Sequence, residues 1–421
     1  MTPLEPGALS RRGFLALGSL SALSWRTAQA LAVAEAASPQ TFASGPAASA
    51  IVLWMDGGPS QLETFDPHPG TAIGGPTRAI KTRVPGIEIA AGLPQVAEQL
   101  DKIAVIRSMV GKEADHDRAA HLMRTGYQPT ESLVHPAFGS ICAAQLSPSE
   151  LPPYISFLSG NSHSRAGYLG DDYDRLCLGD PERPPRNMVA HVSPSRLLSR
   201  MDSLSALERR LKQRSPGLSD RTLHESQVQR AISIVRSEQT RAFRIEEESS
   251  ELRARYGDTP FGRACLAARR LVEVGVRCIE VQLPRWDSHV FNFETHAELN
   301  AVLDPAFATL LSDLAERDLL KSTLVVWAGE FGRTPTIKGL EGRDHWPHGF
   351  SVALAGGGIR GGQVIGETDP QGSPKPKRPV PVQDLLATML TAMGINPRVE
   401  HMVGSRPVKL SEGTAIQELL S

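Results

Sequence analysis

Runs of apolar residues mark the candidate strands in the first part of the chain. Residues 49–55 (SAIVLWM) form a continuous apolar run that ends abruptly at Asp56, as expected of a buried parallel strand that leads into a polar loop. A helical pattern over 93–100 is followed by a second strand-like run at 103–106. The pattern therefore predicts a strand, a helix and a second strand in this region.

Strands and helices alternate more regularly after residue 260. The pattern predicts helices over 263–274, 297–316 and 384–393, and strands over 276–282, 323–327 and 350–354. The stretch 356–382 is dense in Gly, Pro and Lys and predicts a loop or a short hairpin. Strands that alternate with helices of this length are typical of an α/β fold whose mostly parallel sheet is covered on both faces.

The segment 195–256 has a different composition from the rest of the chain. It is charged, periodic at helical spacing and almost free of strand signals. We expect two helices there, inserted into the α/β domain or packed on it, and we expect their charges to form a solvated face.

The N-terminus has the pattern of an export signal. Arg11 and Arg12 precede a mildly apolar run to Trp25, and residues 28–30 (AQA) form a small-residue cleavage pattern. The apolar run is too short and too rich in Ser, Gly and Ala to form a stable membrane span. An ordinary amphipathic first helix is the alternative, but it does not explain why paired arginines and a cleavage pattern occur together.

This signal sets the expected location and domain organisation. We expect an exported protein, periplasmic or extracellular, that is carried by the twin-arginine export machinery. The expected parts are a signal peptide over 1–30, a linker over 31–48 and an α/β domain over 49–421 that contains the insertion 195–256. Because twin-arginine export carries folded proteins, a metal ion can be inserted before export.

Charge and cysteine content exclude two classes of protein. Without residues 1–30 the chain has 42 basic and 45 acidic residues, which is no electrostatic footprint for nucleic acid. Four cysteines are too few for a disulfide scaffold and lack the spacing of a zinc knuckle. Cys265 and Cys278 lie in apolar runs and are expected to be small core residues.

Carboxylates and imidazoles follow the predicted strands. Since ligands of such sheets gather outside the carboxyl ends of the strands, four separate segments are expected to meet at one edge. Their candidate metal ligands are Asp56, Asp287, His289, Glu330, Asp344 and His345. Carboxylate and imidazole without thiolate suit a hydrolytic divalent ion with an open position, zinc first, with manganese, calcium or iron as alternatives.

Each candidate also has a plain structural interpretation. Asp56 can cap a helix or form a turn, and Asp287 with His289 can hydrogen-bond within a turn. Glu330 can form an ion pair with Arg333, and Asp344 can orient an imidazole instead of binding metal. Only the convergence of these segments favours the metal interpretation.

The motifs around these residues resemble a known family. They are 57–62 (GGPSQL), 64–67 (TFDP), 268–273 (ARRLVE), 286–289 (WDSH), 329–335 (GEFGRTP) and 342–347 (GRDHWP). Together they resemble the sulfatase-like family catalogued as domain of unknown function 1501, which looks like a branch of the alkaline phosphatase and sulfatase superfamily. The resemblance covers about residues 50–394. It implies a doubly wound sheet with a metal site at its carboxyl edge.

The resemblance also implies roles for individual residues. Asp56 matches the metal-binding Asp after the first strand, and Asp287 with His289 matches a later ligand pair. Glu330 stands where the superfamily commonly has Asp-His, and His345 stands where it has a further ligating His. A Glu-Phe in place of Asp-His removes one imidazole from a two-metal centre.

The resemblance leaves the place of the nucleophile without a Ser, Thr or Cys. The helical motif 118–127 (RAAHLMRTGY) resembles the helix that the nucleophile opens in sulfatases, and the nucleophile position falls near His116. His116 is therefore a candidate nucleophile, base or ligand, or else a helix-cap histidine. Ser108 is a second candidate, or a hydroxyl bonded to backbone.

Two functions follow from these observations. The first is an exported metal-dependent hydrolase of phosphate or sulfate esters that acts on an anionic small-molecule or glycan ester. In it, Arg333 or Arg343 holds the anionic group, and His116 or a water activated by the metal attacks. The alternative is a catalytically inactive sulfatase-like protein that binds glycans or cell-envelope components.

Overall fold

The computed structural model describes residues 47–159, 166–183, 193–214 and 237–421, all within the second of the chain's two units, residues 41–421. The expected signal peptide 1–30 and nearly all of the linker 31–48 lie outside the described residues. The same holds for part of the insertion 195–256. Within the described residues, no helix is long and apolar enough to cross a membrane.

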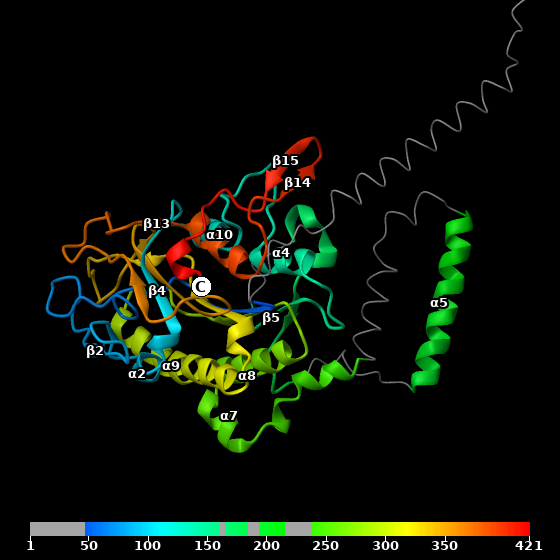
Figure 1. Cartoon of the computed structure of the whole chain (residues 1–421), viewed down its shortest axis with the longest axis horizontal. Helices are drawn as coiled ribbons and strands as arrows, with labels where there is room; N and C mark the ends of the chain where they lie inside the picture. Colours follow the sequence, from blue (N-terminus) through cyan, green and yellow to red (C-terminus); the bar gives the residue numbers. More distant parts are fainter. Residues whose placement is uncertain (1–46, 160–165, 184–192, 215–236) are drawn as a thin grey trace, which may run out of the picture. The chain divides into compact units, whose positions relative to one another are not determined.

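The core of the described chain is a nine-stranded sheet (Figure 1). Its strand order is β12-β4-β11-β8-β1-β7-β5-β6, and β13 also pairs with β4. The bounds of these strands are β1 Ser49–Met55, β4 Ile103–Val110, β5 Tyr154–Phe157, β6 Leu176–Leu178, β7 Cys278–Leu283, β8 Thr323–Ala328, β11 Phe350–Gly356, β12 Gln363–Ile365 and β13 Val380–Pro381. The strand β11 pairs antiparallel with both β4 and β8, and the other pairings are parallel.

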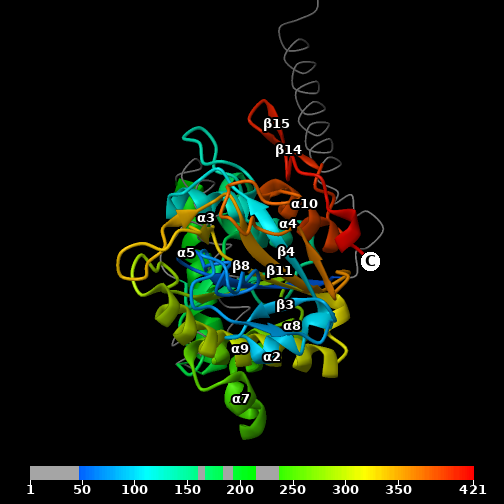
Figure 2. The same cartoon turned by 90° about the vertical axis from the view of Figure 1, so that its left-hand side faces the viewer.

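Helices cover both faces of this sheet, as Figure 2 shows. One face packs on α2 Pro94–Ala97, α7 Ser250–Tyr256, α8 Pro260–Glu273 and α9 Asn292–Glu316, and the other on α3 His116–Thr125, α4 Phe138–Gln145 and α10 Val382–Ala392. The predicted α/β class, with a mostly parallel sheet between helical layers, is therefore confirmed. Burial of both faces explains why the central strands β1 and β8 are nearly continuous apolar runs.

Smaller elements complete the described chain. Three two-stranded ladders pair β2 Ala79–Lys81 with β3 Glu88–Ala90, β9 Gly332–Arg333 with β10 His345–Trp346, and β14 Glu400–Val403 with β15 Arg406–Lys409. The 3-10 turns are η1 Leu100–Lys102, η2 Gly167–Leu169, η3 Asp171–Tyr173, η5 Glu238–Phe243, η6 Ile245–Glu247, η7 Leu320–Ser322 and η8 Gln417–Leu419. The remaining helix is α5 Pro194–Arg214.

The main predicted elements are present, with differences at their ends. The helix predicted over 93–100 is only the single turn α2, whose first amides donate to the Asp304 carboxylate at 2.8 and 3.0 Å, and the turn η1 follows it. The stretch predicted as a loop or hairpin contains the short edge strands β12 and β13. Cys265 and Cys278 are buried core residues, as expected. The strands β5 and β6 and the β14–β15 ladder were not predicted, because each is only three or four residues long.

Candidate metal centre

The candidate site lies at the carboxyl ends of neighbouring strands. The strands β1, β7 and β8 run parallel, and the loops that follow them carry Asp56, Asp287 and Glu330. His116 is the first residue of α3, the element after β4. His345 lies in β10, opposite Arg333 of β9.

The two histidine-bearing turns, 287–289 and 344–345, lie against each other. The backbone N–H of Arg343 donates to the Ser288 carbonyl at 3.1 Å. A Cβ atom on Gly342 would come within 1.7 Å of the carbonyl oxygen of His289. Glycine is therefore required for this close approach of the two backbones.

One carboxylate lies at the centre of three imidazoles. Oδ1 of Asp287 is 3.1 Å from Nε2 of His289 and 3.2 Å from Nε2 of His345. Oδ2 of Asp287 is 3.3 Å from Nε2 of His116. Of the described residues, His116, Asp287 and His345 offer ligand atoms that all lie within 4.8 Å of one another.

The far side of each imidazole is held by an oxygen. Nδ1 of His345 lies 2.6 Å from the Ala114 carbonyl, Nδ1 of His289 lies 3.0 Å from Asp344, and Nδ1 of His116 lies 2.8 Å from Glu330. A carbonyl or carboxylate oxygen can only accept, so each Nδ1 carries the proton. When such a ring is neutral, its lone pair is on Nε2 and faces Asp287, which is how protein histidines are oriented toward a metal.

These atoms fit a small divalent cation. Nε2 of His289 lies 3.0 Å from Nε2 of His345, a contact in which two neutral rings protonated at Nδ1 would have no proton to donate. Nε2 of His116 is buried and forms no hydrogen bond among the described residues, although Oδ2 of Asp287 lies 3.3 Å away. Ligands about 2.0–2.2 Å from a tetrahedral zinc ion are themselves roughly 3.3 Å apart, close to the separations found here. The donor set of imidazole and carboxylate therefore fits zinc.

Asp287 is held ionised. Burial raises the pKa of Asp287, but its hydrogen bond to Arg333 and the charge of that guanidinium, with His116 and His289, outweigh burial and lower it to about 2. Nη2 of Arg333 donates to Oδ1 of Asp287 at 2.7 Å. The pKa of His116 is raised, chiefly by its hydrogen bond to Glu330.

Glu330 and Asp344 contact histidines rather than the centre of the cluster. Oε1 of Glu330 accepts from the Gly57 N–H and from His116, each at 2.8 Å, and the side chain is buried. Asp344 accepts from His289 and from Lys338. Both carboxylates thus orient imidazoles. For Asp344 this is the alternative considered from the sequence, and the imidazole that it orients is His289 rather than His345.

Asp56 faces another residue. Its Oδ1 accepts from the indole Nε1 of Trp54 at 3.2 Å. Its backbone carbonyl accepts from the N–H of Trp286, next to Asp287. Asp56 therefore contributes a backbone hydrogen bond to the segment that carries Asp287. Its side chain is not among the described ligand atoms that lie within 4.8 Å of one another.

Arg333 and Arg343 are interior residues. Both side chains are fully buried. Arg333 donates to the carbonyls of Gly57, Gly58 and Arg343 as well as to Asp287. Arg343 donates to the carbonyls of Ile73, Thr334 and Pro335 and to Glu63. Guanidinium groups committed in this way hold loops together and leave no fork directed at an anionic ligand.

Three contributors were not predicted from the sequence. The Ala114 carbonyl orients His345, and a backbone group has no sequence signal. Lys338 pairs with Asp344. The Phe331 ring lies 4.5 Å from the His345 ring and 5.0 Å from the His116 ring, and it occupies the position where the superfamily motif has the second imidazole. The motif itself is the only signal for Phe331.

The start of α3 carries the possible nucleophile. Asp115, not His116, caps the helix, since its side chain accepts the Arg118 N–H. His116 is thus free of the capping role considered from the sequence. Ser108 donates to the Arg378 carbonyl at 2.6 Å, in agreement with the backbone-bonded alternative.

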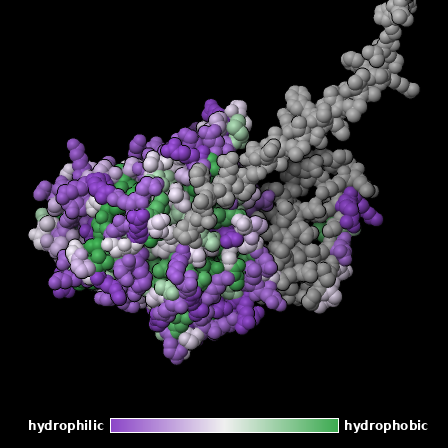
Figure 3. Space-filling model, viewed as in Figure 1, coloured by the Kyte–Doolittle hydropathy of each residue, from purple (hydrophilic) through white to green (hydrophobic). Residues whose placement is uncertain are grey.

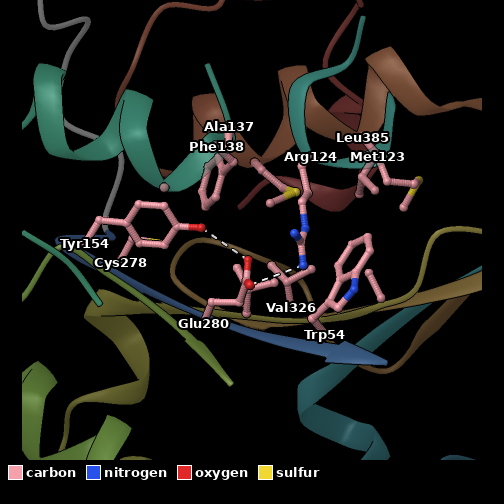
Figure 4. A pocket seen from close by; sticks show the side chains of 14 residues that line it. Trp54, Met123, Arg124, Ala137, Phe138, Tyr154, Cys278, Glu280, Val326 and Leu385 are labelled. Atoms are coloured by element: carbon pink, nitrogen blue, oxygen red, sulfur yellow. Dashed lines mark hydrogen bonds and ion pairs between the residues drawn. The ribbon is translucent and has the colours of Figure 1, made fainter. Parts of the chain in front are cut away.

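The far end of α3 is tied to the sheet by a buried ion pair. Arg124 lies over the Trp54 ring at 4.2 Å and donates to Glu280 at 3.2 Å. Figure 4 shows Arg124 and Tyr154 pointing toward Glu280 in a pocket beneath the helices. The charges of Arg124 and Arg175 outweigh burial and lower the pKa of Glu280. This contact fixes the helix whose first residue is His116.

Comparison with known proteins identifies a family. The family model described as "Protein of unknown function (DUF1501)" matches residues 47–420. No curated protein matches the sequence.

Several solved structures are loosely similar. Lipoteichoic acid synthase LtaP from Listeria monocytogenes is 10% identical, with a TM-score of 0.40 over 92% of this chain and 81% of that one. A protein in the alkaline phosphatase superfamily from Vibrio parahaemolyticus is also 10% identical, with a TM-score of 0.37 over 92% and 77%. The periplasmic domain of EcEptC from Escherichia coli, in complex with zinc, is 8% identical, with a TM-score of 0.39 over 88% and 94%. Likeness at this level says nothing about chemistry.

Proposed function

Because this chain belongs to the DUF1501 family, whose description assigns no activity, we propose from its own site that it is an exported metal-dependent hydrolase of phosphate or sulfate esters. The observation that carries the proposal is the convergence of three Nε2 atoms on the Asp287 carboxylate, each ring being held by an oxygen at Nδ1.

In this proposal His116, Asp287 and His345 hold the metal and His289 completes the set. Glu330 and Asp344 orient His116 and His289 instead of binding the ion themselves. A divalent ion bound there would polarise an ester oxygen and lower the pKa of a water molecule. Zinc fits the donors best, with manganese, calcium and iron as alternatives.

The charge of the cluster supports an anionic substrate. Three carboxylates, on Asp287, Glu330 and Asp344, face the two cations Arg333 and Lys338. With neutral imidazoles the cluster has one negative charge in excess, and a divalent ion reverses that sign. A phosphate or sulfate ester of a small molecule or a glycan is then attracted to the site.

The chain's own residues would supply the rest of the chemistry. Arg333 keeps Asp287 ionised, and Glu330 holds the proton of His116 on Nδ1 so that Nε2 would be free to bind the metal. We propose that Arg333 and Arg343 position the site's loops and do not contact the anion. The position of the sulfatase nucleophile, near His116, has no Ser, Thr or Cys. This favours the alternative, an inactive protein that binds glycans or cell-envelope components, so the experiment must distinguish the two.

The test is metal analysis of purified protein together with turnover of 4-nitrophenyl phosphate and 4-nitrophenyl sulfate. We expect about one metal ion per chain, and loss of metal and turnover in Asp287→Ala and His345→Ala. Asp56→Asn is the matched control that should retain both. Metal-free wild-type protein with no turnover that still binds a polysaccharide would instead support the binding protein.

A further inference from the structure

Large apolar side chains are exposed beside the candidate metal centre. Six large hydrophobic residues are exposed in the described part of the chain, and three of them are Val290, Phe291 and Leu340, with exposed fractions of 48%, 48% and 63%. Hydrophilic residues cover most of the described surface on the face drawn in Figure 3. Three exposed large apolar residues on two adjoining turns are therefore unusual, because such residues are normally scattered singly.

These three residues, the apolar rim, belong to the same turns as the metal centre. Val290 and Phe291 directly follow His289, and Leu340 lies in the turn that Gly342 closes against His289. The Phe291 N–H donates to the Leu340 carbonyl at 2.8 Å, and the Asn292 N–H donates to the Glu341 carbonyl at 3.0 Å. The two turns lie side by side in Figure 2. A ligand at His289 would therefore meet the rim.

Two residues of the turns that carry the apolar rim have an unfavourable backbone conformation. Phe291 and Glu341 both have a φ of +53°, a left-handed conformation that is unfavourable for residues other than glycine. Lys338 and Gly342 exchange two backbone hydrogen bonds of 2.8 Å, which close the turn that carries Leu340. Strain held by hydrogen bonds on both sides gives a fixed platform, and such strain gathers at functional sites.

Charge completes the pattern of an amphiphile site. The metal centre would take an anionic group, and two cations near it in sequence, Lys338 and Arg285, are 60% and 72% exposed in ion pairs with Asp344 and Glu298. The three side chains of the rim are apolar and offer no hydrogen-bonding partner to sugar hydroxyls. We infer that the substrate is an amphiphilic ester: its phosphate or sulfate binds at the metal centre, and its apolar alcohol portion lies on Val290, Phe291 and Leu340.

This inference rests on the proposed hydrolase, and its test separates the two. The probes are phenyl phosphate and 4-methyl-, 4-propyl- and 4-pentylphenyl phosphate, with the matching sulfates, each used as monomers below its aggregation concentration. A para-alkyl group hardly alters the leaving group, so a dependence on its length reports contact with apolar surface. Turnover and calorimetric binding are measured on the metal-loaded full chain.

We expect kcat/KM, and binding, to increase about twofold per methylene, which is half the effect of full burial. The double variant Phe291→Ser, Leu340→Ser should remove this increase with chain length. Met402→Ser, which changes an equally exposed residue on the β14–β15 ladder, should keep the increase. Each of these variants changes exposed side chains, so folding is retained.

The outcomes are distinct. Turnover without chain-length dependence, or with the same dependence in the double variant, overturns the inference while the hydrolase stands. Chain-length-dependent binding without any turnover, abolished in the double variant, supports the amphiphile site and contradicts the hydrolase. If the double variant loses only binding to phospholipid vesicles and keeps the chain-length dependence, the rim is a membrane contact and the inference is wrong.

Discussion

Nε2 of His289 and Nε2 of His345 lie 3.0 Å apart with no proton between them when both rings are neutral. The Nδ1 protons of the two rings are directed at Asp344 and at the Ala114 carbonyl. Two lone pairs at this distance repel unless a cation or an added proton lies between them.

Orientation of His116 by Glu330 should matter for metal affinity. Glu330→Gln keeps an oxygen that can accept from the Gly57 N–H and His116, whereas Glu330→Ala removes it. We expect Glu330→Ala to weaken zinc binding by about 10–100-fold, as for other groups that orient ligands, and Glu330→Gln to weaken it much less. Competition with a chromogenic chelator measures both. An equal loss in the two variants would mean that the charge of Glu330, not its hydrogen bonds, is what matters.

Contact between the two histidine turns should depend on Gly342. Gly342→Ala puts a methyl group against the His289 carbonyl, so the turns must separate. We expect weaker zinc binding by at least about tenfold, with a smaller loss of folding stability. Gly179→Ala is the matched control, because nothing lies within 4 Å of a Cβ atom there. Unchanged zinc affinity in Gly342→Ala would show that His289 is not a ligand.

The sequence predicts the fold well because helices cover both faces of the sheet, and a strand buried on both faces is apolar at successive positions. Buried runs such as 49–55 and 323–327 are apolar throughout, and the loops after them are polar, so the strand ends and their common edge could be predicted. The site could be predicted only in part. Its residue types mark the centre, but they do not distinguish Asp287, which faces three imidazoles, from Asp56, which faces Trp54.

The roles of the arginines could not be predicted for a related reason. Arg333 and Arg343 stand in polar motifs that resemble anion-binding loops, but their partners are mainly backbone carbonyls from segments distant in sequence. Backbone carbonyls have no side-chain signature. A buried guanidinium satisfied by carbonyls and a guanidinium that binds substrate therefore look alike in sequence.

Removing the charge of Glu280 should destabilise the whole domain. Glu280 is buried and accepts from Arg124, Arg175, Tyr154 and Gln282. We expect Glu280→Gln to lower the free energy of unfolding by about 3–5 kcal/mol, the usual cost of breaking a buried ion pair from one side. Glu298→Gln, in an exposed pair with Arg285, should cost under about 1 kcal/mol. Urea unfolding compares them, and similar losses would refute the structural role of the Glu280 pair.

Acid should destabilise the fold through His296. This buried ring accepts the Ser60 N–H at Nε2 and contacts the Asn292 carbonyl through Nδ1, both at 2.8 Å. Burial is the main cause that lowers its pKa from 6.5 to about 4. Between these two values the unfolded chain binds a proton that the folded chain does not, so stability falls as the pH falls.

For a single histidine this linkage amounts to about 2 kcal/mol of unfolding free energy between pH 7 and pH 5. His296→Gln keeps one acceptor and one donor but cannot titrate, so its loss between these pH values should be smaller by that amount. Other histidines, such as His135, whose pKa is also about 4, contribute equally to both proteins and cancel in the difference. Urea unfolding at the two pH values gives the comparison. An identical decrease in the two proteins would show that His296 is protonated in the folded state at pH 5, in which case its Nε2 no longer accepts from Ser60.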